Sequence, residues 1–296
     1  MIRTLLTALS AAGAALSPRA LRLCGSALGA ALWAGLPGRR RETAARIGER
    51  LGLDAASARA LARRTFGHNA QSFLEILMTR RVDPRFLHER VEFENPGLFD
   101  ALRTSTRPIV AATAHLGAWE LLVGLMGAFS PAETCHVVVR LPRNAALAEA
   151  IVRLRSQPRI HILPHRDAAR NTLSHLRSGG KSAFLVDHNC KRAEAEFLPF
   201  VGRTAAVNKG PAILALRAKA EVWPIFLLRL PDDRFRFVTL PVLDTARLTG
   251  DLDQRVREIC RFYTRAVEDM VLRYPDQWFW MHRRWKTRPE GEEGDD

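Results

Sequence analysis

The sequence has 296 residues, of which 47% are hydrophobic and 26% are charged, and these proportions exclude an intrinsically disordered chain. Its 45 basic and 31 acidic residues give a formal net charge of +14, which favours an anionic partner such as nucleic acid, anionic lipid or an acidic carrier protein. The four cysteines lie far apart and form no C-x-x-C pair, so neither a disulfide framework nor a zinc site is predicted.

Residues 1–38 are rich in Ala, Leu and Gly and are predicted to form a hydrophobic membrane anchor. Neither of the charge-free runs in this segment reaches the ~18–20 residues that a secure transmembrane helix needs. The basic cluster Arg39-Arg40-Arg41 follows at once, which is typical of the cytoplasmic, anionic side of a membrane. A cleaved signal peptide is the alternative, but the large, cysteine-poor remainder argues against it. We therefore expect an uncleaved anchor that lies in the inner leaflet or crosses it.

Residues 39–106 are predicted to form a helical segment followed by a linker. The apolar residues within 42–80 have the spacing of two helices. The stretch 82–106 contains two proline turn signals and reads as a linker. Within that linker, the alternation of charged and apolar residues at 91–94 predicts a short exposed strand.

From residue 107 to residue 289, strand-like and helix-like segments alternate along the chain. This pattern is typical of βαβ units and predicts an α/β fold, with a mostly parallel mixed sheet flanked by helices. The Asp232-Asp233 pair indicates a hairpin between the last two strands, so one edge of the sheet is expected to be antiparallel. Strands are expected near residues 108–114, 135–140, 160–163, 182–187, 222–229 and 234–241, and helices near 118–129, 144–156, 167–178, 209–220 and 252–273. Residues 290–296 form an acidic tail that is predicted to be disordered.

The stretch from Pro108 to Glu120 combines a predicted buried strand, a turn and the start of a helix. Residues 109–114 form the short apolar run, and Gly117 permits a tight turn. His115 follows the strand, and a carboxylate from the first helical turn would fix its tautomer and prepare it as a general base. The alternative is a satisfied core histidine beside a glutamate that interacts favourably with the helix dipole.

Polar residues also follow other predicted strands, and the carboxyl ends of parallel strands meet at one edge of a sheet. Arg140 is a candidate for binding phosphate or stabilising developing negative charge, with a plain salt bridge as the alternative. Asp187 is a candidate for orienting a base or a hydroxyl, with an ordinary turn aspartate as the alternative. The segment 191–209 shows little regular pattern, and connections of this length often serve as lids or binding loops.

Other chemistries find little support in the sequence. Neither a G-x-S-x-G motif nor a G-x-x-x-x-G-K-[ST] motif is present. His161 and His165 are four positions apart, but Pro164 lies between them and no acidic ligand is adjacent, so no metal site is expected. Since no nucleic-acid-binding module or aromatic pattern appears, no nucleic-acid partner is predicted.

Several motifs together resemble one known family. His115 to Glu120, with the sequence HLGAWE, match the H-x4-[DE] motif of glycerolipid-type acyltransferases, here in its HX4E form. The matches that follow resemble the lipid A biosynthesis lauroyl/myristoyl acyltransferases, a family of the lysophospholipid/glycerolipid acyltransferase superfamily. They are Val138-Val139-Arg140 with Asn144, Val186-Asp187, FLPFVG at 197–202, Ala215 to Ala220, Pro224 to Arg229, and PDQWFWMHRRWKTRP at 275–289. The last block is the most specific, and the resemblance spans residues 5–289.

The chain departs from the family pattern at three places. His188 replaces the usual glutamine, Val201 replaces a phenylalanine, and residues 207–209 replace an often threonine-rich stretch. These positions lie around the expected acyl or acceptor pocket. They bear on substrate detail more than on the type of reaction.

The resemblance implies transfer of a fatty acyl chain from acyl carrier protein to a hydroxyl of a lipid A precursor or related glycolipid, within lipopolysaccharide biosynthesis. It also implies a place at the inner (cytoplasmic) membrane, with the active site facing the cytoplasm and an anionic membrane surface as a partner. His115 would be the catalytic base with Glu120 as its partner, and no cofactor or metal is expected. The residues expected to bind substrate or stabilise an oxyanion are Arg140, Asn144, Asp187 and Lys209.

Two other functions fit the same residues. A sister acyltransferase that acts on a phosphatidylinositol mannoside or another glycolipid would share the fold and the H-x4-E pair. A non-catalytic membrane or nucleic-acid binding protein would use only the positive charge. The C-terminal block at 278–286 also has two interpretations, an aromatic and basic surface at the level of lipid headgroups or a segment packed under the sheet.

Overall fold

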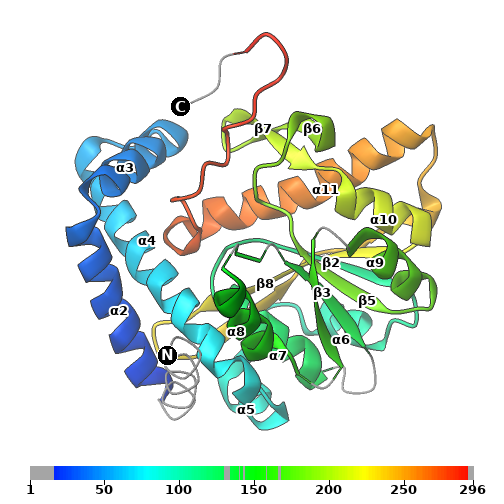
Figure 1. Ribbon diagram of the computed structural model, residues 1–296, viewed down its shortest axis with the longest axis horizontal. Coiled ribbons are helices and arrows are strands. Elements are labelled where there is room, and N and C mark those ends of the chain that lie inside the picture. The colour runs from blue at the N-terminus through cyan, green and yellow to red at the C-terminus, as the bar shows by residue number, and fades with distance from the viewer. Residues whose placement is uncertain are drawn as a thin grey trace.

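A mixed sheet flanked by helices forms the centre of the molecule (Figure 1), which confirms the expected α/β fold. The computed structural model describes residues 17–129, 134–139, 141–142, 144–157, 159–165 and 168–292. The strand order is β1-β9-β8-β2-β5-β3-β4, and β10 pairs with β8. The strands are β1 (Val91–Phe93), β2 (Ile109–Thr113), β3 (Cys135–Val139), β4 (Ile160–Pro164), β5 (Lys181–Leu185), β8 (Glu221–Arg229), β9 (Phe235–Thr239) and β10 (Leu243–Asp244).

Five neighbouring strands, β8, β2, β5, β3 and β4, run parallel, as the alternation of strands and helices predicts. The strand β9 runs antiparallel to β8 after a hairpin in which Asp233 adopts a φ of 63°. The predicted antiparallel edge is therefore confirmed, and β1 extends it by pairing parallel to β9. The parallel register places the carboxyl ends of β2 and β5 side by side, and this pairing positions the site described below.

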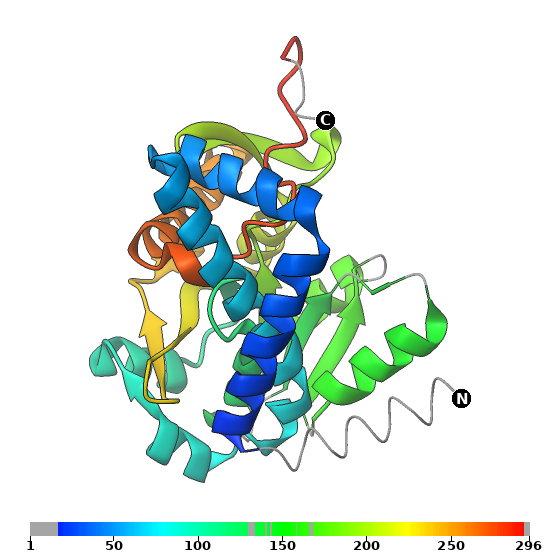
Figure 2. The ribbon, with the colours of Figure 1, turned by 90° about the vertical axis from the view of Figure 1, so that its left-hand side faces the viewer.

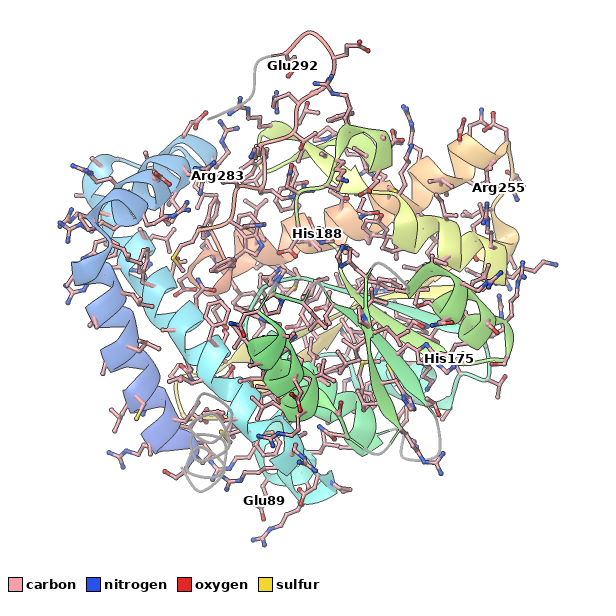
Figure 3. All side chains as sticks on the ribbon, in the orientation of Figure 1. Glu89, His175, His188, Arg255, Arg283 and Glu292 are labelled. Atoms are coloured by element: carbon pink, nitrogen blue, oxygen red, sulfur yellow. The ribbon has the colours of Figure 1, made fainter. Side chains whose placement is uncertain are left out.

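Both faces of the sheet are covered by helices. Alternate residues of β2 face opposite layers: Ile109 and Ala111 pack in one hydrophobic cluster, whereas Val110 and Ala112 pack in the other. The helices of this region are α5 (Pro84–Arg90), α6 (Pro96–Thr104), α7 (Trp119–Phe129), α8 (Ala145–Arg155), α9 (Ala168–Arg177), α10 (Gly210–Ala218) and α11 (Leu252–Arg273). Short 3₁₀ helices are η1 (Ile76–Arg81), η2 (Arg192–Glu194), η3 (Thr245–Arg247) and η4 (Pro275–Gln277). Side chains fill the space between these layers (Figure 3).

The N-terminal helices α2 (Pro18–Gly35), α3 (Pro37–Leu51) and α4 (Ala55–Glu75) lie along one side of the sheet (Figure 2). The helices α2 and α4 cross closely, since a Cβ added at Gly29 would lie 2.6 Å from the Cα of Gly67. Among the described residues, no helix has the length and apolar character needed to cross a membrane. The first 16 residues of the expected anchor lie outside the described part of the chain.

Two segments differ from what the sequence predicts, and in a third the structure decides between two interpretations. The expected linker 82–106 contains α5 and α6 around β1, which is the predicted short strand. The segment 191–209, expected to be irregular, forms a hairpin of β6 (Ala195–Phe200) and β7 (Arg203–Asn208). In the C-terminal block, Trp278, Trp280 and Trp285 are buried, so this block packs in the core instead of forming an aromatic surface. Residues 293–296 of the predicted acidic tail lie outside the described residues.

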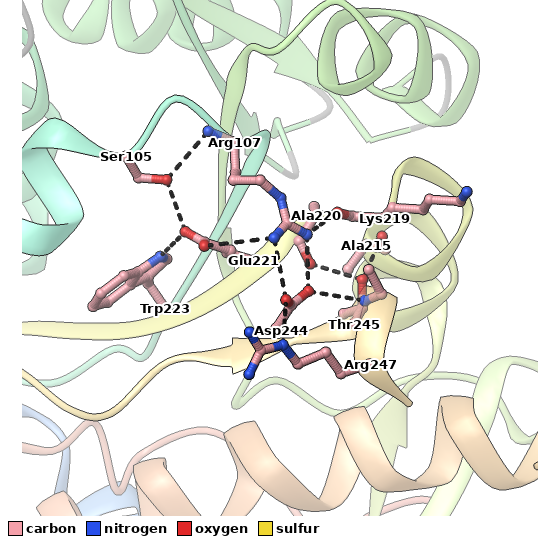
Figure 4. A network of polar contacts seen from close by, with 11 residues as sticks. Ser105, Arg107, Ala215, Lys219, Ala220, Glu221, Trp223, Asp244, Thr245 and Arg247 are labelled. Carbon is pink, nitrogen blue, oxygen red and sulfur yellow. Dashed lines mark hydrogen bonds and ion pairs between the residues drawn. The ribbon is translucent and has the colours of Figure 1, made fainter. Parts of the chain in front are cut away.

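A polar network fastens the amino ends of β2 and β8 (Figure 4). Arg107 donates to both carboxylate oxygens of Asp244, at 3.1 and 2.8 Å. The Ser105 hydroxyl and the Trp223 indole both donate to Glu221, at 2.8 and 3.0 Å. The network lies at the amino ends of these parallel strands, opposite their carboxyl ends, and we assign it a structural role.

Candidate active site

His115 lies in the turn between β2 and α7, and backbone contacts on two sides hold this turn. The Phe279 N–H donates to the His115 carbonyl at 2.9 Å, and the Gly117 N–H donates to the Gln277 carbonyl at 3.0 Å. Gly117 has a φ of 64°, and a Cβ there would lie 2.1 Å from the carbonyl oxygen of Leu227 on β8. Only glycine fits this position, because both the left-handed backbone and the close approach exclude a side chain.

The carboxylate that contacts the His115 ring belongs to Asp187. The Nδ1 atom of His115 lies 2.9 Å from Asp187 Oδ1, and the His115 backbone N–H donates to Oδ2 at 3.0 Å. The Trp278 indole N–H also donates to Oδ2, at 2.9 Å. The fully buried Asp187 side chain is thus held by three hydrogen bonds, which fix it against the imidazole.

Electrostatics couple the two partners. Burial by itself lowers the pKa of His115, but the charge and hydrogen bond of Asp187, with a smaller contribution from Glu120, outweigh burial and raise this pKa above its ordinary value. Burial by itself raises the pKa of Asp187, yet the adjacent His115, the more distant His282 and the Trp278 hydrogen bond hold it well below its usual range. Asp187 is therefore ionised at neutral pH, and it favours a proton on Nδ1 of His115.

The other ring nitrogen of His115, Nε2, makes no hydrogen bond to any described residue, and the side chain is 27% exposed. A neutral imidazole that donates from Nδ1 presents a lone pair at Nε2, which is the arrangement a general base requires. Beside this ring lie Trp119, at 5.6 Å between ring centroids, and Phe279, at 6.1 Å. Phe73 packs edge-on against both of these rings and is itself 50% exposed, so the base opens next to an apolar surface.

Glu120 does not occupy the position expected from the H-x4-E spacing. The buried Glu120 carboxylate accepts two hydrogen bonds from Arg155 of α8, from Nε at 2.8 Å and from Nη2 at 2.5 Å. The first-turn glutamate therefore binds a guanidinium, and the ring partner comes from the end of β5. Glu120 is close enough to favour the imidazolium of His115 through its charge alone.

The remaining predicted residues are distributed differently. Asn144 is exposed and caps α8, where its side chain accepts from the Leu147 N–H at 3.0 Å. Lys209 is half-buried at the start of α10, and its N–H donates to the Glu194 carbonyl. Arg140 lies outside the described residues. The structure thus brings His115 and Asp187 together and places Glu120 on the adjoining helix.

A family model for bacterial lipid A biosynthesis acyltransferases matches residues 2–287 of the chain. The chain belongs to this family. The resemblance inferred from the motifs is confirmed. The lipid A biosynthesis lauroyltransferase of Escherichia coli K12 is 30% identical over 133 residues, which cover 43% of this chain and 40% of that protein. The lipid A biosynthesis palmitoleoyltransferase of the same organism is 24% identical over 207 residues, covering 68% of this chain and 63% of that protein.

A solved structure, the 1-acyl-sn-glycerophosphate acyltransferase PlsC from Thermotoga maritima, is a more distant similarity. It matches with a TM-score of 0.39 and 12% identity, covering 72% of this chain and 83% of that chain. The assignment of this chain to the lipid A acyltransferase family therefore depends on the match to the family model.

Arg155 is the functional-site residue that sequence reasoning missed in this member of the acyltransferase family. It lies in the last turn of α8, where a basic residue also suits the helix dipole, so no local signal marks it. No group of three or more His, Cys, Asp or Glu side chains in the described part of the chain is arranged to hold a metal ion.

Proposed function

We propose that this chain transfers a fatty acyl group from the thioester of an acyl carrier protein to a hydroxyl of a lipid A precursor. The observation that carries the proposal is the His115–Asp187 pair, in a member of the lipid A acyltransferase family. The His115 ring is partly exposed, and its Nε2 has no hydrogen-bond partner among the described residues. Asp187 holds the ring at Nδ1, and Nε2 is left to accept a proton. This arrangement suits activation of a hydroxyl group that belongs to the substrate.

In the proposed reaction, Nε2 of His115 accepts the proton of the acceptor hydroxyl while the hydroxyl oxygen attacks the thioester carbonyl carbon. Asp187 stabilises the imidazolium that forms, since it holds Nδ1–H at 2.9 Å. The tetrahedral intermediate collapses, the carbon–sulfur bond breaks, and the imidazolium returns the proton to the leaving thiolate. The products are an ester and a free carrier thiol, and a positioned base of this kind contributes ~10²–10⁴ in rate.

Other residues have supporting roles in this proposal. The Glu120–Arg155 pair fixes the start of α7, and the Glu120 carboxylate favours the imidazolium of His115 while the Arg155 guanidinium opposes it. Arg140, which the motif order places after the second strand of the α/β region, supplies positive charge for the oxyanion or for a substrate phosphate.

The surface of the chain suits an acidic donor and a lipid acceptor. The net charge of +14 favours approach of an acidic carrier protein and of anionic lipid. The exposed side of α2 and the residue that ends it present three apolar side chains, Leu23 (59% exposed), Leu28 and Leu36, which suit contact with lipid. We propose that this face rests on the inner membrane, with His115 on the cytoplasmic side.

The test is mass spectrometry of the product formed by purified protein from acyl carrier thioesters and candidate glycolipid acceptors. An added acyl mass on a lipid A precursor supports the proposal, and its loss in a folded His115→Ala variant assigns the base. If only a phosphatidylinositol mannoside is acylated, that glycolipid is the acceptor instead of a lipid A precursor. Full activity of His115→Ala would show that His115 is not the base.

A further inference from the structure

A cavity lies on the side of α4 that faces α2, apart from the His115 ring. Its volume is about 480 Å³. The first turns of α2, one face of α4, the β8–β9 turn and η4 line it. His115, Trp119 and Phe279 of the candidate active site do not line it. The proposed acyl transfer assigns no role to this cavity.

The wall of this cavity contains a buried guanidinium with unused donors. Arg229 donates from Nε and Nη2 to the two oxygens of Glu75, at 2.8 and 2.5 Å, and from Nη2 to the Ser72 hydroxyl at 2.6 Å. Its Nη1 atom has no hydrogen-bond partner among the described residues, although the side chain is only 5% exposed. A buried donor without an acceptor costs free energy, so a ligand oxygen at this point would stabilise the protein.

A second nitrogen at the same cavity, on His68, also lacks a partner among the described residues. His68 Nδ1 is buried and forms no hydrogen bond within the part of the chain that the structure describes, while Nε2 lies 3.8 Å from Asp276. Burial and the nearby charge of Arg229 lower the pKa of His68 to about 4. At neutral pH this ring is therefore uncharged, and its protonation would rise with the arrival of an anion.

The charged side chains around the cavity are largely paired with one another. The carboxylates that line it are engaged by arginines: Glu75 by Arg229, and Asp233 by Arg22 at 2.5 Å. Asp276 lies 3.5 Å from Arg64, which is largely exposed at the rim. The charged lining residues are Arg22, Arg64, Arg229, Arg234, Glu75, Asp233 and Asp276. Arg234 pairs with Asp232 and Glu92 beside the cavity, so the unpartnered Nη1 of Arg229 is the feature that favours an oxyanion here.

We propose that this cavity binds a phosphate group. The Nη1 group of Arg229 and the guanidinium of Arg64 at the rim can each donate hydrogen bonds to oxygens of a phosphate. The volume exceeds that of phosphate alone, and Leu21, Met78 and Phe235 form an apolar side that suits the carbon part of a phosphate ester. The phosphate is either free in solution or part of a lipid headgroup beside the apolar face of α2.

Hydrogen bonds connect the cavity to the catalytic turn. Arg229 donates to the Ser72 hydroxyl, whose single proton has two acceptors within reach at 3.0 Å, the carbonyls of His68 and Gly117. Gly117 lies two residues after His115, so an occupied cavity would rigidify the turn that carries the base. Binding of phosphate itself does not depend on acyl transfer, and the two proposals are tested separately.

Two probes test this site on the full-length protein. Calorimetric titration uses inorganic phosphate against chloride at equal ionic strength, and vesicle flotation uses phosphatidylcholine with and without phosphatidic acid. Saturable binding of inorganic phosphate identifies a free-phosphate site. Binding that appears only with phosphatidic acid identifies a headgroup site. Absence of saturable binding to either probe would contradict the proposal and leave water as the occupant.

Variants on α4 separate this site from general charge attraction. Arg64→Gln removes a rim arginine, whereas Arg63→Gln removes the same charge from an exposed neighbour that does not line the cavity. Arg229→Lys keeps the buried positive charge but loses the planar guanidinium and its several N–H donors. The fold of this variant is checked by circular dichroism. We expect about tenfold weaker binding in Arg64→Gln and Arg229→Lys and little change in Arg63→Gln. Equal binding by Arg63→Gln and Arg64→Gln would overturn the proposal, whatever the fold of Arg229→Lys.

Discussion

At the residue scale, the partner of His115 is set by strand register. The strands β2 and β5 pair with Thr113 opposite Leu185, and two further residues along each chain lead to His115 and Asp187. These two residues are 72 positions apart, so only the pairing of the strands brings them into contact. His188 directly follows Asp187 and marks this end of the sheet in Figure 3.

The pairing of Glu120 with Arg155 gives a prediction about stability. Arg155→Ala would leave the buried Glu120 carboxylate without its cation, and we expect the free energy of unfolding to fall by about 3 kcal/mol. Urea unfolding followed by circular dichroism measures this change. Adding Glu120→Gln to Arg155→Ala removes the uncompensated charge and should restore part of the loss. Equal stability of Arg155→Ala and the unmodified protein would show that the pair is not needed for folding.

The same residues show what sequence reasoning can and cannot reach. His115 and Asp187 were each identified because polar residues at the carboxyl ends of parallel strands meet at one edge. The H-x4-E spacing suggested Glu120 as the ring partner, since both residues flank one turn. Local spacing does not reveal Arg155, which approaches from another helix and satisfies Glu120 instead.

At the element scale, the crossing of α2 and α4 depends on glycine. A Cβ at Gly25 would lie 2.8 Å from Gln71, and one at Gly29 would lie 2.6 Å from Gly67. These glycines, with Leu21, are the buried residues of α2, so they form the contact stripe that holds this helix on the domain. The sequence identifies the segment as apolar, but the glycines at this spacing are the signal for a close helix contact.

Gly29→Ala tests this crossing. The added methyl group would force the helices apart, and we expect a loss of about 1–3 kcal/mol in the free energy of unfolding. Gly67→Ala is the matched control, because its Cβ would meet nothing within 4 Å and should stabilise α4 by about 0.5–1 kcal/mol. Thermal unfolding of both variants gives the comparison. A similar response in the two variants would contradict the close packing.

The hairpin of β6 and β7 escaped prediction for a local reason. Its turn consists of Val201 and Gly202, both with positive φ, at 46° and 71°. Two-residue turns of this kind favour Asn-Gly or Asp-Gly, and a β-branched residue in the left-handed region is rare. The Val201 N–H donates to Glu268 of α11 and the side chain is buried, so tertiary contacts impose a turn that the local sequence disfavours.

At the scale of the whole molecule, the +14 charge predicts strong salt dependence with a carrier-bound donor. Attraction between a basic protein and an acidic carrier raises the association rate and is screened by salt. We expect kcat/KM with acyl carrier protein to fall by about tenfold on going from low to high salt. An uncharged acyl-pantetheine thioester is the control and should show little change. The same salt dependence for both donors would rule out electrostatic docking of the carrier.

The pH–rate profile of Asp187→Asn tests the central claim, that Asp187 prepares His115 as the base. Because the pKa of His115 is raised, the wild-type kcat/KM should rise with pH through an apparent pKa above 6.5 and then level off. In Asp187→Asn, burial would still lower the pKa of His115, but the carboxylate that raises this pKa would be gone. The acidic limb should then shift below that of the wild type, and the plateau should fall by ~10²–10⁴. A folded Asp187→Asn variant with an unchanged limb and plateau would contradict the account.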